Sequence, residues 1–513
     1  MKITIFASII AALTPFATAK KYVWPSLYDE IEEILSLQGG YLSRRFADGR
    51  TGGIDGSIWF ELNRVENGGL AFNNTFNFFN FLYSTRASAA DLLAMSVIAS
   101  HSSCGGTTKI SFCYGRVEAE EAGPAGVPET HTPLETMLAR FATAGYSQED
   151  MITMVACGHT LGGVHSVNNP QISIGDTNVY NDTVTHFDGS PNQYDNTVAV
   201  EYVRGTTTNP LVVHTNSTIT SDKRIIRSDK NKTISALARK PSVFETKCAN
   251  IFSRMIDTVA RSVKLSPPIE AIDIKPKITK LYLDEEGSLV FSGRVRVRTT
   301  QGVKKGRDPS DLSVHLTFAN RKGKGSTVIK TEHAGNSTGL YGETFAWYEF
   351  STTIKLSSGI SKFNIHLTVP SKKETTKYTN GGHGYLVDDS VLYQEDVSCV
   401  SRTTMNGTRR FTIRVAVQKE QSSSPLTLEI VRFEKRQGVI VRKMGIETVN
   451  FEPIGESSGI WVFFEATVQL ATSAWSTTFD IVSEGMRKHP GKSGYPEANI
   501  EFLRTQTCPR VSS

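Results

Sequence analysis

The imidazole of His159 is the side chain best placed for chemistry in this sequence. Residues 154–165 read Met-Val-Ala-Cys-Gly-His-Thr-Leu-Gly-Gly-Val-His, and the apolar residues before His159 predict a helix that ends on this histidine. Upstream, Ser147 and Asp150 have the spacing of a capping box, which predicts where that helix begins. Threonine and small residues follow His159, so its imidazole can leave the helix end towards a flat cofactor. Neutral imidazole is a common metal ligand, and the stretch therefore predicts a cofactor site.

The elements that must position this histidine are mostly helices, over residues 24–265. Stretches with apolar residues at helical spacing are 28–37, 88–100, 132–143 and 244–263. The pattern changes at Ser266-Pro-Pro268, and beyond Leu281 polar and apolar residues alternate with a period of two.

The clearest predicted strands are 289–297, 347–356, 363–369, 411–417 and 460–468, whereas 372–384 has the composition of a loop. Short alternating strands separated by turn residues are typical of antiparallel β sandwiches. We therefore expect a multidomain chain with a mainly α domain followed by one or two β sandwiches. The expected limits are 20–268 for the helical domain, 269–395 for the first β-sandwich domain and 396–513 for a second β-rich domain.

Composition is ordinary for a globular protein of several domains: 513 residues, 39% hydrophobic, with a formal net charge of +5. The densest basic run has no nucleic-acid-binding motif beside it, so we expect a solvated loop and no nucleic-acid partner. This run is made of Lys304, Lys305, Arg307, Arg321, Lys322 and Lys324.

The N-terminus has the features of a secretory signal. A lysine precedes an apolar run from Ile3 to Phe16, and Ala17-Thr-Ala19 fits a small-residue cleavage site, which predicts a signal peptide over residues 1–19. The run is too short to span a bilayer, and no later stretch predicts a transmembrane segment. Six Asn-x-Ser/Thr sequons agree with a secreted, extracellular glycoprotein. They are Asn73, Asn181, Asn216, Asn231, Asn336 and Asn406.

Six cysteines are present, and in an oxidising compartment some of them should pair. Their spacing fits no zinc site. Cys399 and Cys508 bracket the last segment of the chain and predict one disulfide. Cys157, two residues before His159, is expected to be a small packed residue rather than a metal thiolate.

The segment Ala156-Cys-Gly-His-Thr-Leu-Gly162 resembles the proximal-histidine segment of the secreted haem peroxidases of plants and fungi, and the chain is most similar to the fungal, class II type. The resemblance covers roughly half of the chain, and weaker matches follow in family order. They are Ser88-Ala-Ala-Asp91, Cys104-Gly-Gly106, Gly115-Arg116 and Gly126-Val-Pro-Glu129. The resemblance implies haem b with His159 as its axial ligand. It further implies that Asp222, in Thr220-Ser-Asp-Lys-Arg224, is the carboxylate behind that ligand.

The same resemblance implies two calcium sites made of hard oxygen ligands. Gly52-Gly-Ile-Asp-Gly-Ser57 matches the distal calcium loop and offers Gly53, Asp55 and Ser57. On the proximal side the implied ligands are Thr160, Asp188, Ser190 and Asp195. The implied activity is reduction of hydrogen peroxide with oxidation of small phenolic-type donors. The β domains would bind a surface or another protein.

The opposite side of the family's haem pocket has no match in this sequence. The family carries Arg-x-x-Phe-His-Asp before the calcium loop, where the histidine acts as general base and the arginine stabilises charge. Ser43-Arg-Arg-Phe-Ala-Asp48 has serine and alanine at those two positions, and a second alignment leaves a whole helix missing between Gly49 and Arg50. Glu61 and Asn67 match the residues that support the absent histidine.

Two other functions therefore stay open: a catalytically impaired haem-binding protein, and a β-domain adhesin whose helical half is vestigial. Simpler roles also stay open for single residues. His159 would then cap helix carbonyls, and Asp222 and Asp55 would be turn residues.

Overall fold

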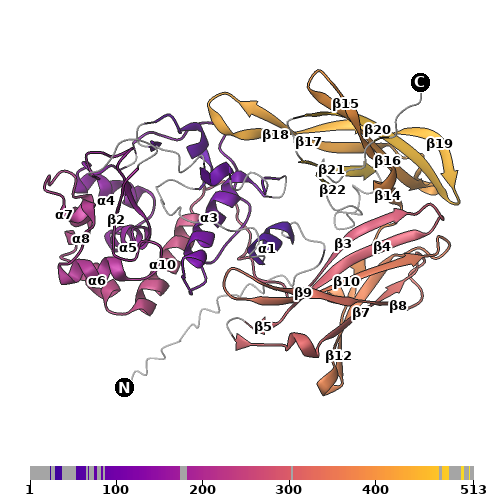
Figure 1. Ribbon diagram of the computed structural model, residues 1–513, viewed down its shortest axis with the longest axis horizontal. Coiled ribbons are helices and arrows are strands. Elements are labelled where there is room, and N and C mark those ends of the chain that lie inside the picture. Colours follow the sequence, from indigo (N-terminus) through magenta and orange to yellow (C-terminus); the bar gives the residue numbers. More distant parts are fainter. Residues whose placement is uncertain are drawn as a thin grey trace, which may run out of the picture.

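A computed structural model describes residues 24, 29–36, 54–64, 67–68, 74–77, 82–84, 87–126, 128–173, 182–301, 304–472, 476–483, 498–501 and 508. Helices occupy one side of the molecule and β-sheets the other (Figure 1). Within the described residues, no helix is both long and apolar enough to cross a bilayer. The helical elements are α1 (Asp29–Ser36), η2 (Ser57–Phe60), α3 (Ala89–Ser103), α4 (Leu134–Thr143), α5 (Gln148–Gly158), α6 (Thr197–Arg204), α7 (Pro210–Val213), α8 (Ser221–Arg227), α9 (Lys232–Ala238) and α10 (Pro241–Ile256).

Helix ends in this half follow local sequence signals. The side chain of Ser88 accepts a hydrogen bond from the Asp91 amide (3.0 Å) and begins α3. The capping box predicted for α5 is confirmed, because Ser147 and Asp150 each accept a hydrogen bond from the other's backbone amide. One hydrophobic core joins α3, α4, α5, α9 and α10.

Helices α5 and α10 are also joined covalently. Cys157 and Cys248 form a disulfide with a Cα–Cα distance of 5.5 Å. The prediction that Cys157 is a packed residue agrees with its burial in the helical core, but it did not include this disulfide. The partner of Cys157 lies 91 residues away on a second helix, where no local pattern could indicate it.

Apart from the short hairpin β5–β6, the described β region forms four antiparallel sheets in two pairs. In the first pair, sheet β3-β4-β10-β9 shares a core with sheet β12-β11-β7-β8, to which β13 adds. In the second pair, sheet β14-β16-β20-β19, with β15, shares a core with sheet β18-β17-β21-β22. Strand β14 precedes residue 396 but pairs with β16 of the second sandwich.

The strands are β3 (Ile274–Leu283), β4 (Leu289–Arg298), β5 (Thr300–Gln301), β6 (Lys304–Lys305), β7 (Ser313–Ala319), β8 (Thr327–Lys330), β9 (Glu332–Thr338), β10 (Thr344–Ile354), β11 (Lys362–Val369), β12 (Glu374–Tyr378), β13 (Tyr385–Leu386), β14 (Val391–Tyr393), β15 (Cys399–Met405), β16 (Thr408–Gln418), β17 (Leu426–Arg436), β18 (Val439–Asn450), β19 (Glu452–Ser458), β20 (Trp461–Ala471), β21 (Ser476–Ser483) and β22 (Ala498–Glu501). A short hairpin, β1 (Gly163–His165) with β2 (Val184–His186), lies in the helical half.

Two further sequence predictions can be checked in the β region. The Cys399–Cys508 disulfide is confirmed, with a Cα–Cα distance of 4.8 Å. The prediction of a loop over residues 372–384 was wrong, because this segment contains β12, an edge strand that pairs with β11. Most of its side chains are exposed, so the apolar alternation that marks a buried strand is absent.

Helix α1 lies between the helical half and the first sandwich (Figure 1). Its Ile31 and Ile34 enter the helical core, whereas its Glu32 faces strands β3 and β4. The Glu32 carboxylate pairs with Lys275 (2.8 Å) and with Arg296, and all three side chains are buried. Helix α1 is thus held by ion pairs with basic residues that lie more than 240 positions later in the sequence.

A second contact between the two halves comes from the β17–β18 hairpin, which extends over the helices (Figure 1). Val441 is 1% exposed and belongs to the helical core. Phe433 lies 5.7 Å from the ring of Tyr83, and the Arg436 guanidinium lies 4.7 Å from the ring of Phe60 in η2. The second sandwich therefore packs on the segment that precedes Glu61.

Candidate functional site

His159 is the residue immediately after α5, where its backbone amide still bonds to the carbonyl of Val155. Its Nδ1 lies 2.7 Å from Oδ2 of Asp222, which is near the start of α8. The Asp222 side chain is only 3% exposed, and that of His159 is 21% exposed. Two residues 63 positions apart are thus brought into direct contact.

The surroundings of Asp222 keep it ionised. Burial alone would raise the pKa of this carboxyl, but the His159 imidazole and hydrogen bonds from Asn209 and Ser221 lower its pKa overall. Asn209 donates to Oδ2 (2.9 Å), and its own side-chain oxygen accepts from the Leu211 amide, which begins α7. Sequence reasoning missed Asn209, although the Asn-Pro dipeptide at residues 209–210 is a turn signal.

An ionised Asp222 determines which nitrogen of His159 is available to bind a metal. A carboxylate only accepts hydrogen bonds, so Nδ1 must carry the proton and Nε2 carries the lone pair. The ring of Phe187 stacks on that of His159 with centroids 4.1 Å apart and an angle of 10° between the planes. The sequence placed Phe187 beside Asp188 but gave no indication of this stacking.

These contacts fit a haem iron on the proximal side. The imidazole is oriented by a buried carboxylate, its tautomer is fixed, and an aromatic ring limits its rotation. His165 is not part of this arrangement: its Nδ1 contacts Asp182 at an exposed hairpin.

The four residues implied as proximal calcium ligands lie together. The Thr160 hydroxyl donates to the carbonyl of Asp195 (2.6 Å), and the Ser190 hydroxyl donates to the Asp195 carboxylate (3.1 Å). The Ser190 amide donates to Oδ1 of Asp188 (2.9 Å). The second oxygen of Asp188, Oδ2, is buried and has no hydrogen-bond donor among the described residues.

The charge on Asp188 is poorly compensated. Burial, together with the nearby charges of Asp195 and Glu201, raises its pKa to about 6. The described residues contain no cluster of three or more His, Cys, Asp or Glu side chains arranged to hold a metal ion. The set at this position instead combines two carboxylates with two hydroxyls and a carbonyl, which suits calcium. Glu201 was missed, because nothing in the sequence linked helix α6 to this loop.

On the other side, the described residues include Asp55, Ser57, Glu61 and Asn67. Asp55 accepts a hydrogen bond from the Ser57 amide (3.0 Å), as in an Asx turn. Asn67 donates to the carbonyl of Glu61 (3.1 Å). The Glu61 carboxylate accepts from the Gly123 amide (2.6 Å). Gly53, the segment 43–48 and the junction of Gly49 with Arg50 lie outside the described residues.

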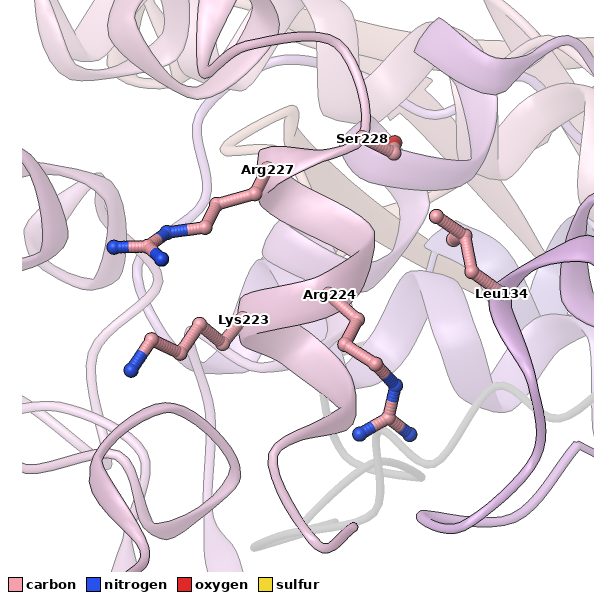
Figure 2. A pocket seen from close by; sticks show the side chains of 5 residues that line it. All are labelled: Leu134, Lys223, Arg224, Arg227 and Ser228. Atoms are coloured by element: carbon pink, nitrogen blue, oxygen red, sulfur yellow. The ribbon is translucent and has the colours of Figure 1, made fainter. Parts of the chain in front are cut away.

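A cavity of about 320 Å³ lies beside α8, lined by one leucine, one serine and three basic side chains. Figure 2 shows Lys223 and Arg227 extending from one side of the helix and Arg224 from the other. Arg224 donates to the carbonyl of Ser217 (2.9 Å) and to that of Thr130. None of the predicted site residues lines this cavity, so it is separate from the contacts of His159.

Comparisons with known proteins agree with this geometry. A WSC domain-containing protein of Arthroderma benhamiae is 34% identical to this chain over 403 residues, which are 69% of this chain and 54% of that protein. This chain thus spans about half the length of that curated relative. The sequence model of the peroxidase family matches residues 28–239, the region that holds His159, Phe187 and Asp222. Residues 28–239 are therefore similar to the peroxidase family.

Proposed function

We propose that this chain is a secreted haem peroxidase of the fungal type, which reduces hydrogen peroxide and oxidises small phenolic-type donors. The observation that carries the proposal is the contact of His159 with the buried Asp222 at 2.7 Å. His159 would hold haem b through Nε2, and the bound iron would supply the centre at which peroxide is reduced. The family match over residues 28–239 supports the same class of activity.

The protein's own residues have defined tasks in this proposal. Asp222 holds the proton on Nδ1 of His159, so that Nε2 keeps its lone pair. Asn209 holds Asp222 in place, since its amide donates to the same carboxylate oxygen. Phe187 covers one face of the imidazole and keeps it from turning. Together they fix the direction and the basicity of one nitrogen.

Calcium would stabilise this arrangement from the loop that follows. Thr160 is adjacent to His159, and its hydroxyl bonds to Asp195, so a cation bound there would hold the end of α5. Secretion is part of the proposal as well. It is supported by the two disulfides and by the exposure of the sequons at Asn336 and Asn406.

The test is a hemin titration of the recombinant chain followed by absorbance. We expect a Soret band with the wild-type protein and its loss or displacement in His159→Ala, with unchanged far-UV circular dichroism. Identical spectra for wild type and His159→Ala would contradict the assignment. Peroxide turnover with a phenolic donor is then measured on the loaded protein.

A second function is favoured by a separate sequence observation. The Arg-x-x-Phe-His-Asp segment is not found before Gly52, so general acid–base help worth about 10²–10⁴-fold in rate is missing. Glu61 and Asn67 are in contact with each other, although the sequence provides no distal histidine for them to support. A chain that binds hemin but shows no turnover would be a haem-binding protein without peroxidase activity.

A further inference from the structure

The first β sandwich has two outer faces, and each carries a group of basic residues, although on the first sheet Glu349 and Glu332 continue the row of Lys277 and Arg294. On the sheet β3-β4-β10-β9, Lys275 lies opposite Arg296 and Lys277 lies opposite Arg294. Paired residues of antiparallel strands point to the same side of a sheet, so these four cations form one patch. The protein itself covers this patch with α1, whose Glu32 and Glu33 pair with all four side chains.

The second sheet carries a similar row on its own outer face. Across strands β8, β7, β11 and β12, directly paired residues are Lys330, His315, His366 and Lys377. Their chain neighbours Ile329, Leu316, Ile365 and Leu367 are buried in the core, which places the row on the outside. The two imidazoles stack with centroids 4.6 Å apart.

The second row differs from the first in its charge partners. Among the described residues, none of the four side chains forms an ion pair, in contrast to the row beneath α1. Both lysines are exposed and both histidines are partly exposed. Glu374, on β12, alternates with Lys377 and so belongs to the other side of the strand, and Asp311 is bonded to Ser371 at the end of β11.

The local field around His366 is positive. Burial lowers the pKa of this imidazole, and His315 and Lys377 lower it further. Lys362 lies on the same strand and the same face, and the remaining neighbour, Thr317, is a hydroxyl that bonds to His366 (3.0 Å). An anion placed over the row would reverse this effect and favour the protonated imidazole.

We propose that the outer face of the sheet β12-β11-β7-β8, here called the His–Lys face, binds an acidic polysaccharide, a chain of sugars that bear carboxylate or sulfate groups. The row crosses three strand spacings, about 14 Å in all, which lets one extended polymer reach four cations. Neutral hydrogen-bonding groups surround the row and suit sugar hydroxyls. They are Ser313, Thr317, Asn364, Thr368 and Thr375.

The choice of partner follows from charge and shape. On the first sheet, the basic residues form ion pairs with the carboxylates of α1. Carboxylate or sulfate groups of a ligand would pair with the second row in the same way. Among the described residues of these strands, Val328 is the exposed large apolar side chain, and such a polar surface suits a sugar polymer better than a membrane. Their paired residues include no arginine, a side chain that base recognition in a nucleic-acid groove favours.

The experiment measures binding of the full-length protein to immobilised dextran sulfate, with neutral dextran as the blank. Binding is compared at about pH 5.5 and about pH 8, on either side of the ordinary histidine pKa of about 6.5. Protonation of His366 beneath a bound anion adds positive charge to the face, so we expect binding about two- to five-fold tighter at the lower pH. High salt should weaken it at both pH values.

Two double variants and one control separate the contributions. His315→Ala/His366→Ala should lose the pH dependence, and Lys330→Ala/Lys377→Ala should weaken binding at both pH values. Lys435→Ala/Lys443→Ala removes two exposed lysines from the second sandwich and should leave binding unchanged. All substituted side chains are at least partly exposed, and equal thermal unfolding temperatures will verify that the variants fold.

Several outcomes would overturn the proposal. The first is no difference between dextran sulfate and neutral dextran. The second is an equal loss in the control variant, which would mean that net charge alone drives binding. The third is equally tight binding of duplex DNA or anionic vesicles to the wild type, which would mean that the face does not select sugars.

Discussion

Glu32 and Glu33 are neighbours on α1, yet replacing each of them should lower the free energy of unfolding by very different amounts. The Glu32 side chain is 2% exposed, and its partners Lys275 and Arg296 are 6% and 1% exposed. Removing one partner from a buried ion pair costs about 3–5 kcal/mol, because the remaining charge stays buried. Of its contacts with described residues, Arg296 would keep the one with the ring of Phe345, 4.6 Å from the guanidinium carbon. We therefore expect Glu32→Ala to lower the free energy of unfolding by about 3–5 kcal/mol.

Glu33 is the matched control. Its partners Lys277 and Arg294 are 50% and 32% exposed, so solvent screens both pairs. Glu33→Ala should cost about 1 kcal/mol or less. Urea unfolding followed by circular dichroism and tryptophan fluorescence measures both values. A loss below about 1 kcal/mol for Glu32→Ala, or equal losses for the two variants, would refute the reasoning.

The same pair predicts a pH dependence. Burial would raise the pKa of Glu32, but Lys275 and Arg296 lower it below its ordinary value of 4.5. A carboxyl whose pKa is lower in the folded state stabilises the fold fully above the unfolded pKa and loses this effect as pH falls. Wild type and Glu32→Ala should therefore differ most near neutral pH and converge in acid. A difference that grows on acidification would show that the sign is wrong.

Three further perturbations test other parts of the structure. Asp222→Asn should weaken hemin binding about 10–100-fold in an absorbance titration, and wild-type affinity would contradict the proposed role of Asp222. Replacing Cys157 and Cys248 by serine removes a disulfide between positions 91 residues apart. The free energy of unfolding should fall by about 4–5 kcal/mol in a chemical unfolding experiment, and a fall below about 1 kcal/mol would refute the estimate. Val441→Asp places a charge at a site that is 1% exposed, so it should accelerate backbone amide hydrogen exchange in η2. Ile446→Asp is the control, because this site on the same strand is 61% exposed and the substitution should leave the exchange in η2 unchanged.

Local signals predicted the parts of the fold that local physics determines. The capping box at Ser147 and the serine before α3 satisfy backbone amides within a few residues, so the sequence alone was sufficient there. Alternation predicted β4 and β16, because one face of each strand is buried in a sandwich core. Strand β12 was not predicted, because its extended conformation depends on pairing with β11 and its own composition is that of a loop.

Contacts between distant segments could not be predicted in this way. Nothing near Glu32 indicates Arg296, and nothing near Val441 indicates the helical core. At the site, resemblance to a family placed His159 and Asp222 together, and the structure has them 2.7 Å apart. Their roles stay predictions. The stacking of Phe187 and the hydrogen bond of Asn209 depend on packing, for which the sequence has no short-range signal.

The position of α1 has a consequence for biosynthesis. A ribosome makes α1 well before the cations that neutralise Glu32, which follow more than 240 residues later. Synthesis proceeds at roughly 5–20 residues per second, so the basic partners of Glu32 are made on the order of ten to fifty seconds after α1. Through that interval the Glu32 carboxylate lacks the cations that balance its burial, so α1 should be held only weakly by its apolar contacts and chaperone occupancy of the early chain should be high. Ribosomes stalled before β3 should therefore hold a protease-sensitive N-terminal segment, and those stalled after β4 a resistant one.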